Sequence, residues 1–157
     1  MERVIDAAAA VESTVEALVA VLDGARSGQS PSVPPAQLRV LAVIEDNPTN
    51  MSRLAEALEV VPSSASRLCD RLEAAGLLRR VPDPRDRREV RLMLTPSARR
   101  LLDHLRERRR AALATVLERM TPANRQGLVD ALQAFAAAAG DASRNGAGGT
   151  GDGRRTA

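Results

Sequence analysis

Apolar and polar residues alternate along most of this chain with the period of α-helices. The first predicted helix spans about 3–23, where apolar residues recur at intervals of four and three, a spacing typical of a helix that docks on another helix. A second helix is expected over about 36–45. A third is expected over about 52–58, with the side chain of Asn50 as its N-cap. The first helix therefore needs a partner, and the next two are short.

Two long helices are predicted in the C-terminal part of the chain. Thr95-Pro96 and Thr121-Pro122 each place a capping hydroxyl before a proline at the first helical position. We expect the first of these helices to reach about Met120 and the second to reach about Ala139. Residues 140–157 hold six of the ten glycines and almost no large apolar residue, so we expect a disordered tail there.

A helix over about 62–75 and two short strands are predicted between these regions. The helix should bury one face, because four of its apolar residues follow the i, i+3, i+4, i+7 spacing: Ala65, Leu68, Cys69 and Leu72. The strands are expected over 77–81 and 90–94, on either side of a charged turn, and 49–51 could pair with them as a third strand. A helix-turn-helix followed by a basic hairpin is typical of a winged DNA-binding module.

The distribution of charge supports a polyanionic partner. The net charge of +3 divides into −5 over residues 1–78, +7 over 79–110 and +1 over 111–157. Every basic residue is arginine, and the positive region covers the hairpin and the helix after it. A local basic patch on an otherwise acidic body suits phosphate contacts, which release counterions where they form.

Three consecutive motifs give the chain a family resemblance: the segment SRLAEALEVVPSSASRLCDRLEAAGLLRR, a D-x-R-D-x-R pattern formed by Asp83, Arg85, Asp86 and Arg88, and the segment LMLTPSARRLL. Together they resemble the MarR family of winged helix-turn-helix transcriptional regulators. The resemblance covers about 35–140. It implies a mainly α fold with a small β-hairpin wing and an interlocked helical dimerisation region. One departure is Val61, which stands where the family usually has a polar cap residue.

We expect four segments: an N-terminal dimerisation helix and linker (1–34), a winged helix-turn-helix DNA-binding lobe (35–95), C-terminal dimerisation helices (96–139) and the tail (140–157). The apolar stripes of the outer helices are too long to be buried on so small a lobe, which favours a twofold homodimer. The expected dimerisation residues are Val11, Val15, Leu18, Leu113, Val116, Leu117, Leu128, Leu132 and Phe135.

The free face of the helix at 62–75 carries the predicted base contacts. Arg67 has the reach for a guanine, whereas Arg71 is expected to hold a phosphate. Ser63, Ser64 and Ser66 would let this helix approach the bases closely, although serines near a helix start can also be simple N-terminal residues. Arg53 is placed for a further phosphate.

In the wing, the resemblance places Arg88 in the minor groove, oriented by Asp86, with Arg85 and Arg87 near the flanking backbone. A narrow hairpin tip can enter that groove, where a guanidinium meets a deep negative potential. Asp86 and Arg88 could instead only brace the turn, and both roles can coexist. The operator should be a pseudo-palindrome with half-sites about 10 bp apart. Repression by blocking a promoter is the simplest output, and activation stays open.

Several other classes of function find no support in the sequence. No set of nucleophile, base and orienting residue is present, so we expect neither an enzyme nor a cofactor. The single cysteine, Cys69, is expected in the core rather than as a redox switch, and the single histidine, His104, has no second ligand near it for a metal. The absence of a signal peptide and of an apolar run of about 18 residues favours a cytoplasmic protein without a membrane partner.

A small-molecule effector stays open. Family members bind phenolic or lipophilic ligands beside the DNA-binding lobe, and a pocket could form here around five leucines: Leu18, Leu38, Leu41, Leu101 and Leu105. The alternative to DNA binding is a winged-helix adaptor that binds protein, which would not need a basic hairpin tip.

Overall fold

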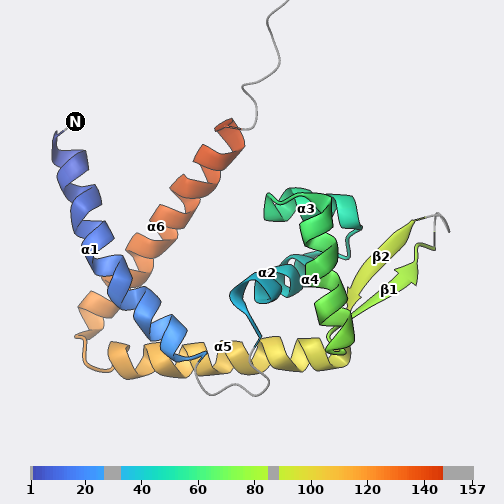
Figure 1. Cartoon of the computed structure of the whole chain (residues 1–157). Helices are drawn as coiled ribbons and strands as arrows, with labels where there is room; N and C mark the ends of the chain where they lie inside the picture. Colours follow the sequence, from blue (N-terminus) through green and yellow to red (C-terminus); the bar gives the residue numbers. More distant parts are fainter. Residues whose placement is uncertain (1, 27–32, 85–88, 147–157) are drawn as a thin grey trace, which may run out of the picture. The chain divides into compact units, whose positions relative to one another are not determined.

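The computed structural model describes residues 2–26, 33–84 and 89–146 of the 157-residue chain. The described elements follow the order α1 (Glu2–Gly24), α2 (Pro35–Asp46), α3 (Met51–Leu58), α4 (Pro62–Ala74), β1 (Leu78–Pro82), β2 (Val90–Leu94), α5 (Pro96–Leu117) and α6 (Pro122–Gly146). Figure 1 shows α2, α3 and α4 gathered beside the hairpin of β1 and β2. The predicted fold, mainly helical with a β-hairpin wing, is confirmed.

One hydrophobic core joins α2, α3, α4 and the hairpin. Its largest side chains without measurable exposure are Leu41, Leu54 and Leu72, one from each of the three helices. Leu92 of β2 is also buried there. The cluster continues into the first turns of α5 through Ala98, Leu102 and Leu105. The expected DNA-binding lobe thus shares its core with the start of the helix that follows it.

The hairpin pairs β1 with β2 in antiparallel register, from Leu78 opposite Leu94 to Pro82 opposite Val90. Alternation turns Leu92 and Leu94 inward. The expected third strand is reduced to a single bridge between Thr49 and Leu92, because Met51 already begins α3. The Leu92 N–H donates to the Thr49 carbonyl over 2.8 Å, and this bond ties the hairpin to the segment before α3.

The turn between α3 and α4 has an unusual backbone conformation. Glu59 ends α3 in the left-handed region, at φ 55° and ψ 41°, where glycine is the usual residue. The Val60 N–H then donates to the Ala55 carbonyl over 3.0 Å, which closes the helix end. The second left-handed residue, Gly76 at φ 69°, follows the end of α4 and leads the chain into β1.

The predicted caps are confirmed by hydrogen bonds. The Asn50 side chain accepts from the Arg53 N–H at the start of α3 over 3.0 Å. Thr95 accepts from the Ala98 N–H at 3.2 Å before α5, and Thr121 accepts from the Asn124 N–H at 3.3 Å before α6. These side chains satisfy amides that a helix start would otherwise leave open.

Helix α6 corrects one boundary. We expected it to end near Ala139, but it continues through Gly140 to Gly146. A single glycine inside a helix costs only about 1 kcal/mol, and no proline follows to stop the helix, so the alanine-rich segment before it can propagate further. The chain divides between Leu113 and Ala114 into two compact units. Residues 147–157, expected as a tail, lie outside the described residues.

Candidate nucleic-acid interface

Helix α4 has one face in the core and one face in solvent. Ala65, Cys69 and Leu72 are fully buried, and Leu68 packs against the core at its edge. This confirms the predicted core face. On the other side Ser63, Arg67 and Arg71 are exposed, whereas Ser64 and Ser66 are half-buried. The three serines and two arginines predicted to contact DNA therefore all keep some access to solvent.

The start of α4 is largely satisfied by its own backbone. Val61 is the N-cap residue and offers no side-chain hydrogen bond, as its side chain predicts. However, its carbonyl accepts from the Ser64 N–H at 2.9 Å and from the Ala65 N–H at 3.2 Å, and Pro62 has no N–H. The Val61 carbonyl therefore covers two amides of the first turn, although the Val61 side chain covers none.

Arg80 of β1 fastens α4 to the wing. Its Nη2 donates to Asp70 over 2.7 Å and its Nη1 donates to Glu73 over 2.6 Å. The hydrogen bond to Asp70, followed by the charge of Glu73, raises the pKa of Arg80 above its ordinary value. Neither Asp70 nor Arg80 was among the residues predicted from the sequence to form the site. One signal in the sequence could have indicated this contact: Asp70 and Glu73 stand about one turn apart on α4, a spacing at which two carboxylates can share one cation.

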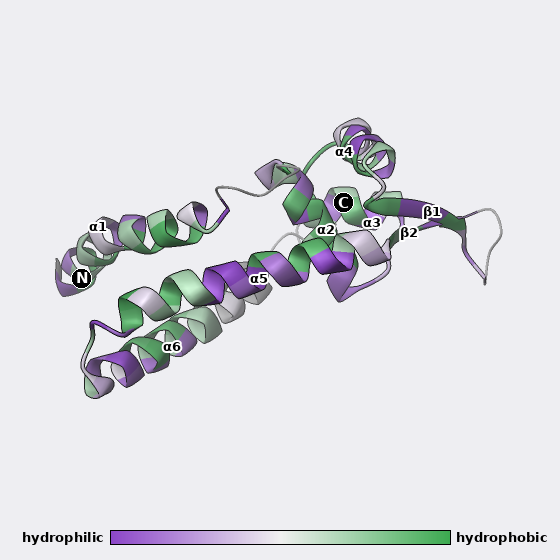
Figure 2. Ribbon diagram, turned by 90° about the horizontal axis from the view of Figure 1, so that it is seen from below, coloured by the Kyte–Doolittle hydropathy of each residue, from purple (hydrophilic) through white to green (hydrophobic). Residues whose placement is uncertain are grey.

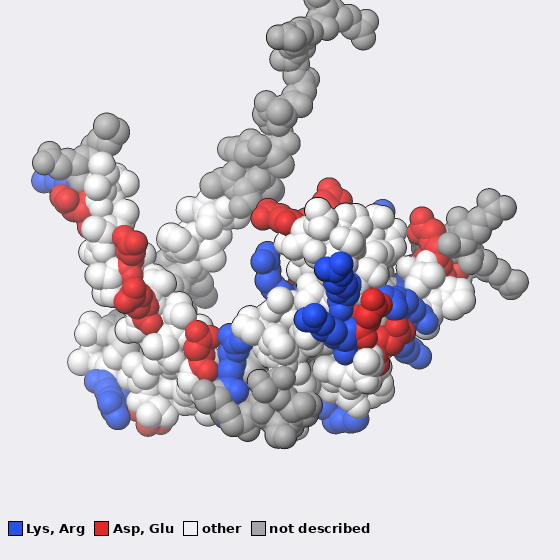
Figure 3. Space-filling model, viewed as in Figure 1, with Lys and Arg blue, Asp and Glu red and all other residues white. Residues whose placement is uncertain are grey.

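This clamp changes the electrostatics of α4. The two carboxylates of Asp70 and Glu73 are both engaged by Arg80. Among the described residues, by contrast, no ion pair is formed by Arg67 or Arg71. Figure 3 shows basic and acidic side chains intermingled on the face that carries α4 and the base of the hairpin. The two unpaired arginines are thus the cations of α4 that a polyanion can reach without displacing a carboxylate.

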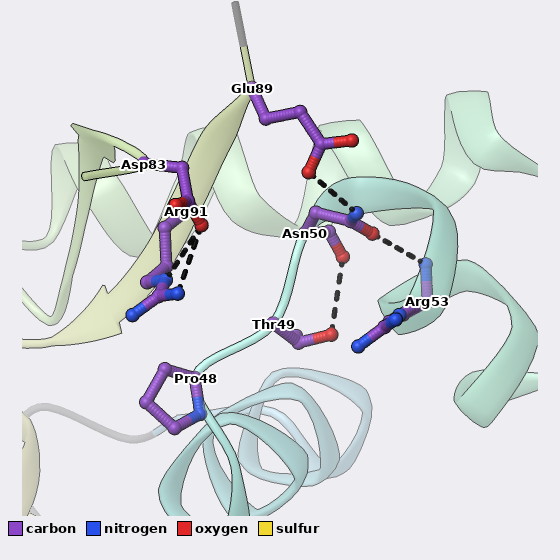
Figure 4. Close-up of a pocket in the computed structure, with 7 residues that line it drawn as sticks. All are labelled: Pro48, Thr49, Asn50, Arg53, Asp83, Glu89 and Arg91. Carbon is purple, nitrogen blue, oxygen red and sulfur yellow. Dashed lines mark hydrogen bonds and ion pairs between the residues drawn. The ribbon is translucent and has the colours of Figure 1, made fainter. Parts of the chain in front are cut away.

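The base of the wing is held by two further polar contacts (Figure 4). Asp83 accepts from Arg91 Nε at 3.1 Å and lies 2.9 Å from Arg91 Nη2, a two-point ion pair within the hairpin. Asn50, besides capping α3, donates from its side-chain amide to Glu89 over 3.4 Å. The cap of α3 is therefore linked through one side chain to the residue that precedes β2.

A cavity of about 360 Å³ lies between these contacts. It is lined by Pro48, Thr49, Asn50, Arg53, Asp83, Glu89 and Arg91. Its lining is polar, with two arginines and two acids. Arg53, which we predicted as a phosphate contact, lies at this cavity in the first turn of α3. Arg53 therefore lies beside the base of the wing.

The wing tip falls outside the described residues. Arg85, Asp86, Arg87 and Arg88 belong to this group. The strands on either side of them are described, and the Asp83 N–H donates to the Glu89 carbonyl at 2.9 Å where the strands approach the tip. The predicted minor-groove contacts of these four residues stay predictions.

The expected dimerisation residues lie at or near the surface of the single chain. Val11, Val15, Val116, Leu128, Leu132 and Phe135 are exposed, and Leu18, Leu113 and Leu117 are half-buried. Phe135, the only aromatic residue of the chain, is 65% exposed. Figure 2 shows hydrophobic residues recurring along α1 and along α6. Apolar surface of this extent is typical of helices that pack against a partner.

Four of the five leucines that we considered for a ligand pocket belong to the hydrophobic core or its edge. Leu38, Leu41 and Leu105 are buried in the core, and Leu101 packs against it. These four leucines therefore belong to the core or its edge, whereas Leu18 of α1 is half-buried and is not a member of this core cluster. A separate cavity of about 350 Å³ is lined by Ile44, Glu45, Pro48, Met93, Leu94 and Arg99.

Cys69 is confirmed as a core residue. It is a free thiol without measurable exposure. Burial raises its pKa from 9.0 to about 11, with Arg80 opposing the rise and Asp70 and Glu73 adding to it. A thiol that stays protonated and inaccessible is a poor nucleophile. His104 lies on the surface of α5, with its Nδ1 3.5 Å from Glu107.

Comparison with known proteins identifies the family. The model of the MarR family matches residues 32–89, which cover α2, α3, α4 and β1 and end just before β2. The chain is similar to the crystal structure of RV1404 from Mycobacterium tuberculosis, with 36% identity, a TM-score of 0.77, and coverage of 83% of this chain and 90% of that one. The chain belongs to the MarR family. Its fold is the winged helix-turn-helix of that family.

A curated relative agrees with this assignment. MdtR, an HTH-type transcriptional repressor of Bacillus subtilis, is 34% identical over 96 residues, which cover 60% of this chain and 62% of MdtR. The match therefore spans about three fifths of that relative's length. FabT of Streptococcus pneumoniae, solved in complex with DNA, shares the fold of this MarR family member at 19% identity, with a TM-score of 0.65 and coverage of 89% and 97%. In the described ranges, no helix combines the length and the hydropathy needed to cross a lipid bilayer.

Proposed function

We propose that this protein is a cytoplasmic transcriptional repressor that binds a pseudo-palindromic operator in double-stranded DNA as a homodimer. The observation that carries the proposal is the construction of α4. Its apolar face is anchored in the core, and its solvent face carries Arg67 and Arg71 without ion-pair partners among the described residues. A helix held in this way can enter a major groove without rearrangement of the fold.

The division of labour on α4 follows from reach and position. Arg67 lies in the second turn of the helix, where a guanidinium can span to N7 and O6 of a guanine. Arg71 lies one turn further from the helix start and holds a phosphate. Ser63, Ser64 and Ser66 keep the first turns slim enough for the backbone to approach the base edges.

The wing supplies the second contact of each subunit. Arg88 reads the minor groove with Asp86 as its orienting partner, while Arg85 and Arg87 contact the flanking backbone. Support comes from the base of the wing, where the Asp83–Arg91 ion pair stiffens the hairpin. Arg53, at the wing base, adds a phosphate contact from α3.

The homodimer is supported by the exposed apolar residues of α1, α5 and α6. Phe135 and Leu132 of α6 and Val15 of α1 present large apolar surfaces that a monomer would leave in water. A second copy would cover them with the same surfaces by twofold symmetry. Two recognition helices then reach successive major grooves, which accounts for the two half-sites of the operator.

The relatives support the same reading. FabT, which shares the fold, has been solved in complex with DNA, and MdtR is a transcriptional repressor. MdtR supplies the reason for preferring repression to activation. No observation favours the adaptor alternative, which becomes an outcome of the DNA-binding experiment.

Selection from a pool of random duplexes by the purified full chain, read by sequencing, tests sequence-specific binding. We expect an enriched pseudo-palindrome, bound with a slope of log affinity against log salt that reports several phosphate contacts. Arg67→Ala should weaken binding by about 1–3 kcal/mol and relax the preference at one base pair of each half-site. Equal, weak retention of every duplex at physiological salt would refute the proposal and favour an adaptor.

Arg119→Ala serves as the matched control for this experiment. Arg119 is exposed in the turn before α6, so its replacement removes the same charge outside the proposed interface. We expect its operator affinity to stay within about twofold of the parent. If Arg119→Ala weakened binding as much as Arg67→Ala does, net charge rather than base reading would explain the effect.

Sedimentation equilibrium tests the dimer. Leu132→Asp places a charge on the apolar stripe of α6 and should shift the protein to monomer at micromolar concentration, because a buried unpaired carboxylate costs several kcal/mol. Gln133→Asp adds the same charge at the next residue of α6, which lies off the stripe, and should stay dimeric. A monomeric parent chain would contradict the proposed architecture directly.

A further inference from the structure

Two adjacent valines join α3 to α4, and only one of them has a structural explanation. Val60 directly follows Glu59, the residue in the left-handed conformation, and its N–H closes the end of α3 on the Ala55 carbonyl. Helix ends of this kind usually carry an apolar residue at that position, which packs back on the helix. Val60 is accordingly more covered than its neighbour, with 38% exposure. The apolar side chain of Val60 is therefore explained by the end of α3.

The apolar side chain of Val61 has no corresponding structural role. It is the N-cap of α4, at φ −67° and ψ 147°, with 62% of its surface exposed. A serine, aspartate or asparagine at an N-cap would accept a hydrogen bond from the first turn, and valine cannot. The caps of α3, α5 and α6 do use such side chains, Asn50, Thr95 and Thr121, whereas the N-cap of α2, Pro34, like Val61, makes no side-chain cap hydrogen bond. Valine at this position therefore gives up stability and also exposes apolar surface.

A local rule broken without a structural gain is expected where a residue serves function. Val61 stands immediately before α4, the helix that we propose for the major groove. In recognition helices it is the N-terminal residues that contact base edges. The exposed Ser63 beside it is small, so the Val61 side chain is not shielded from a duplex by a bulky neighbour.

The major groove offers one apolar group to such a side chain, the 5-methyl group of thymine. Hydrogen-bonding residues read the other base edges, and an apolar residue gains only from this methyl group. We propose that Val61 contacts the 5-methyl group of a thymine in each operator half-site and selects that base pair. This inference rests on the proposed DNA-binding function. It makes Val61 a specificity residue beside Arg67, which reads by hydrogen bonds.

The test uses deoxyuridine, which pairs as thymidine does and lacks only the methyl group. Each thymine of the selected operator is replaced in turn, and the affinity of the full chain is measured for each duplex. For one symmetry-related pair of thymines, we expect replacement in both half-sites to weaken binding by about three- to tenfold, the effect of losing one small apolar contact in each half-site. All other replacements should change affinity by less than about twofold.

Variants then assign this methyl contact to a residue. Val61→Ala should bind the parent operator more weakly and lose its sensitivity to uracil at the identified thymines, so that the two changes are not additive. Val61→Ser should do the same while its thermal midpoint is equal to or above that of the parent, which shows that the loss does not come from misfolding. Val60→Ala is the control and should keep full uracil sensitivity.

The outcomes separate this inference from the proposed function. If the parent binds its operator but no thymine is sensitive to uracil, or if Val61→Ala keeps the parent's sensitivity, Val61 is not a methyl reader and DNA binding itself still stands. If no operator can be selected at all, the proposed function fails and the inference fails with it.

Discussion

The titration of Cys69 gives the most quantitative prediction. The thiol is fully buried, and burial raises its pKa from 9.0 to about 11. The chain contains no lysine and no tyrosine, the side chains that ordinarily titrate near pH 10. Cys69 is therefore the one side chain expected to lose a proton between pH 9 and pH 11. Its effect on the free energy of unfolding can be measured without a contribution from other titrating side chains.

The sign follows from proton linkage. The folded protein holds the thiol proton more tightly than the unfolded chain does, because its pKa is higher in the folded state. The contribution to stability is complete below pH 9, falls as the unfolded chain ionises, and is lost as the pH rises through about 11. Two pKa units correspond to about 3 kcal/mol of unfolding free energy. That is a large share of the roughly 5–15 kcal/mol that stabilises a typical domain.

Urea unfolding from pH 8 to pH 11 at one fixed protein concentration measures this loss. Cys69→Ala is the control: the variant should be less stable at every pH because of the small cavity, but its stability should be flat across the same range. Ultraviolet absorbance of the thiolate, free of tyrosinate in this chain, follows the titration directly. A parallel loss in parent and variant, or a thiolate midpoint near 9 in the folded protein, would refute the reasoning.

Two further predictions concern the contacts around α4. Glu59→Gly should stabilise the protein by about 1 kcal/mol and raise its thermal midpoint by about 2–4 °C, because glycine adopts the left-handed conformation without strain. Glu59→Ala removes the same exposed charge but keeps the strain, so calorimetry should show no gain; equal gains in both variants would point to charge instead. Arg80→Gln breaks the ion pairs with Asp70 and Glu73 and should cost about 1–2 kcal/mol in urea unfolding at about 0.1 M salt. The cost should shrink at about 1 M salt, and a loss independent of salt would mean that Arg80 acts by packing.

Most of the fold was predictable because its signals are local. The spacing of Ala65, Leu68, Cys69 and Leu72 identified the buried face of α4, and caps such as Asn50 and Thr95 marked helix starts. The end of α6 was misjudged, because glycine weakens a helix without stopping it. Thr49 was placed beside the hairpin but forms one bridge only, since the chain turns into α3 directly afterwards.

The candidate site was predictable in part. Residue type and helical position were enough to select Arg67 and Arg71 on the free face of α4. The clamp of Arg80 with Asp70 and Glu73 escaped sequence reasoning, because it joins a strand to a helix and depends on how the two elements meet. The link from Asn50 to Glu89 spans 39 positions and depends on the hairpin folding back to the start of α3.

By itself, the sequence determined which residues are apolar at which period, where helices start, and that positive charge concentrates on the hairpin and the helix after it. These properties are local and survive any arrangement of the elements. Only the tertiary structure decided which charges are neutralised, because ion pairing depends on distances between elements. It paired Asp70 and Glu73 with Arg80 and left Val61 uncovered at the start of α4.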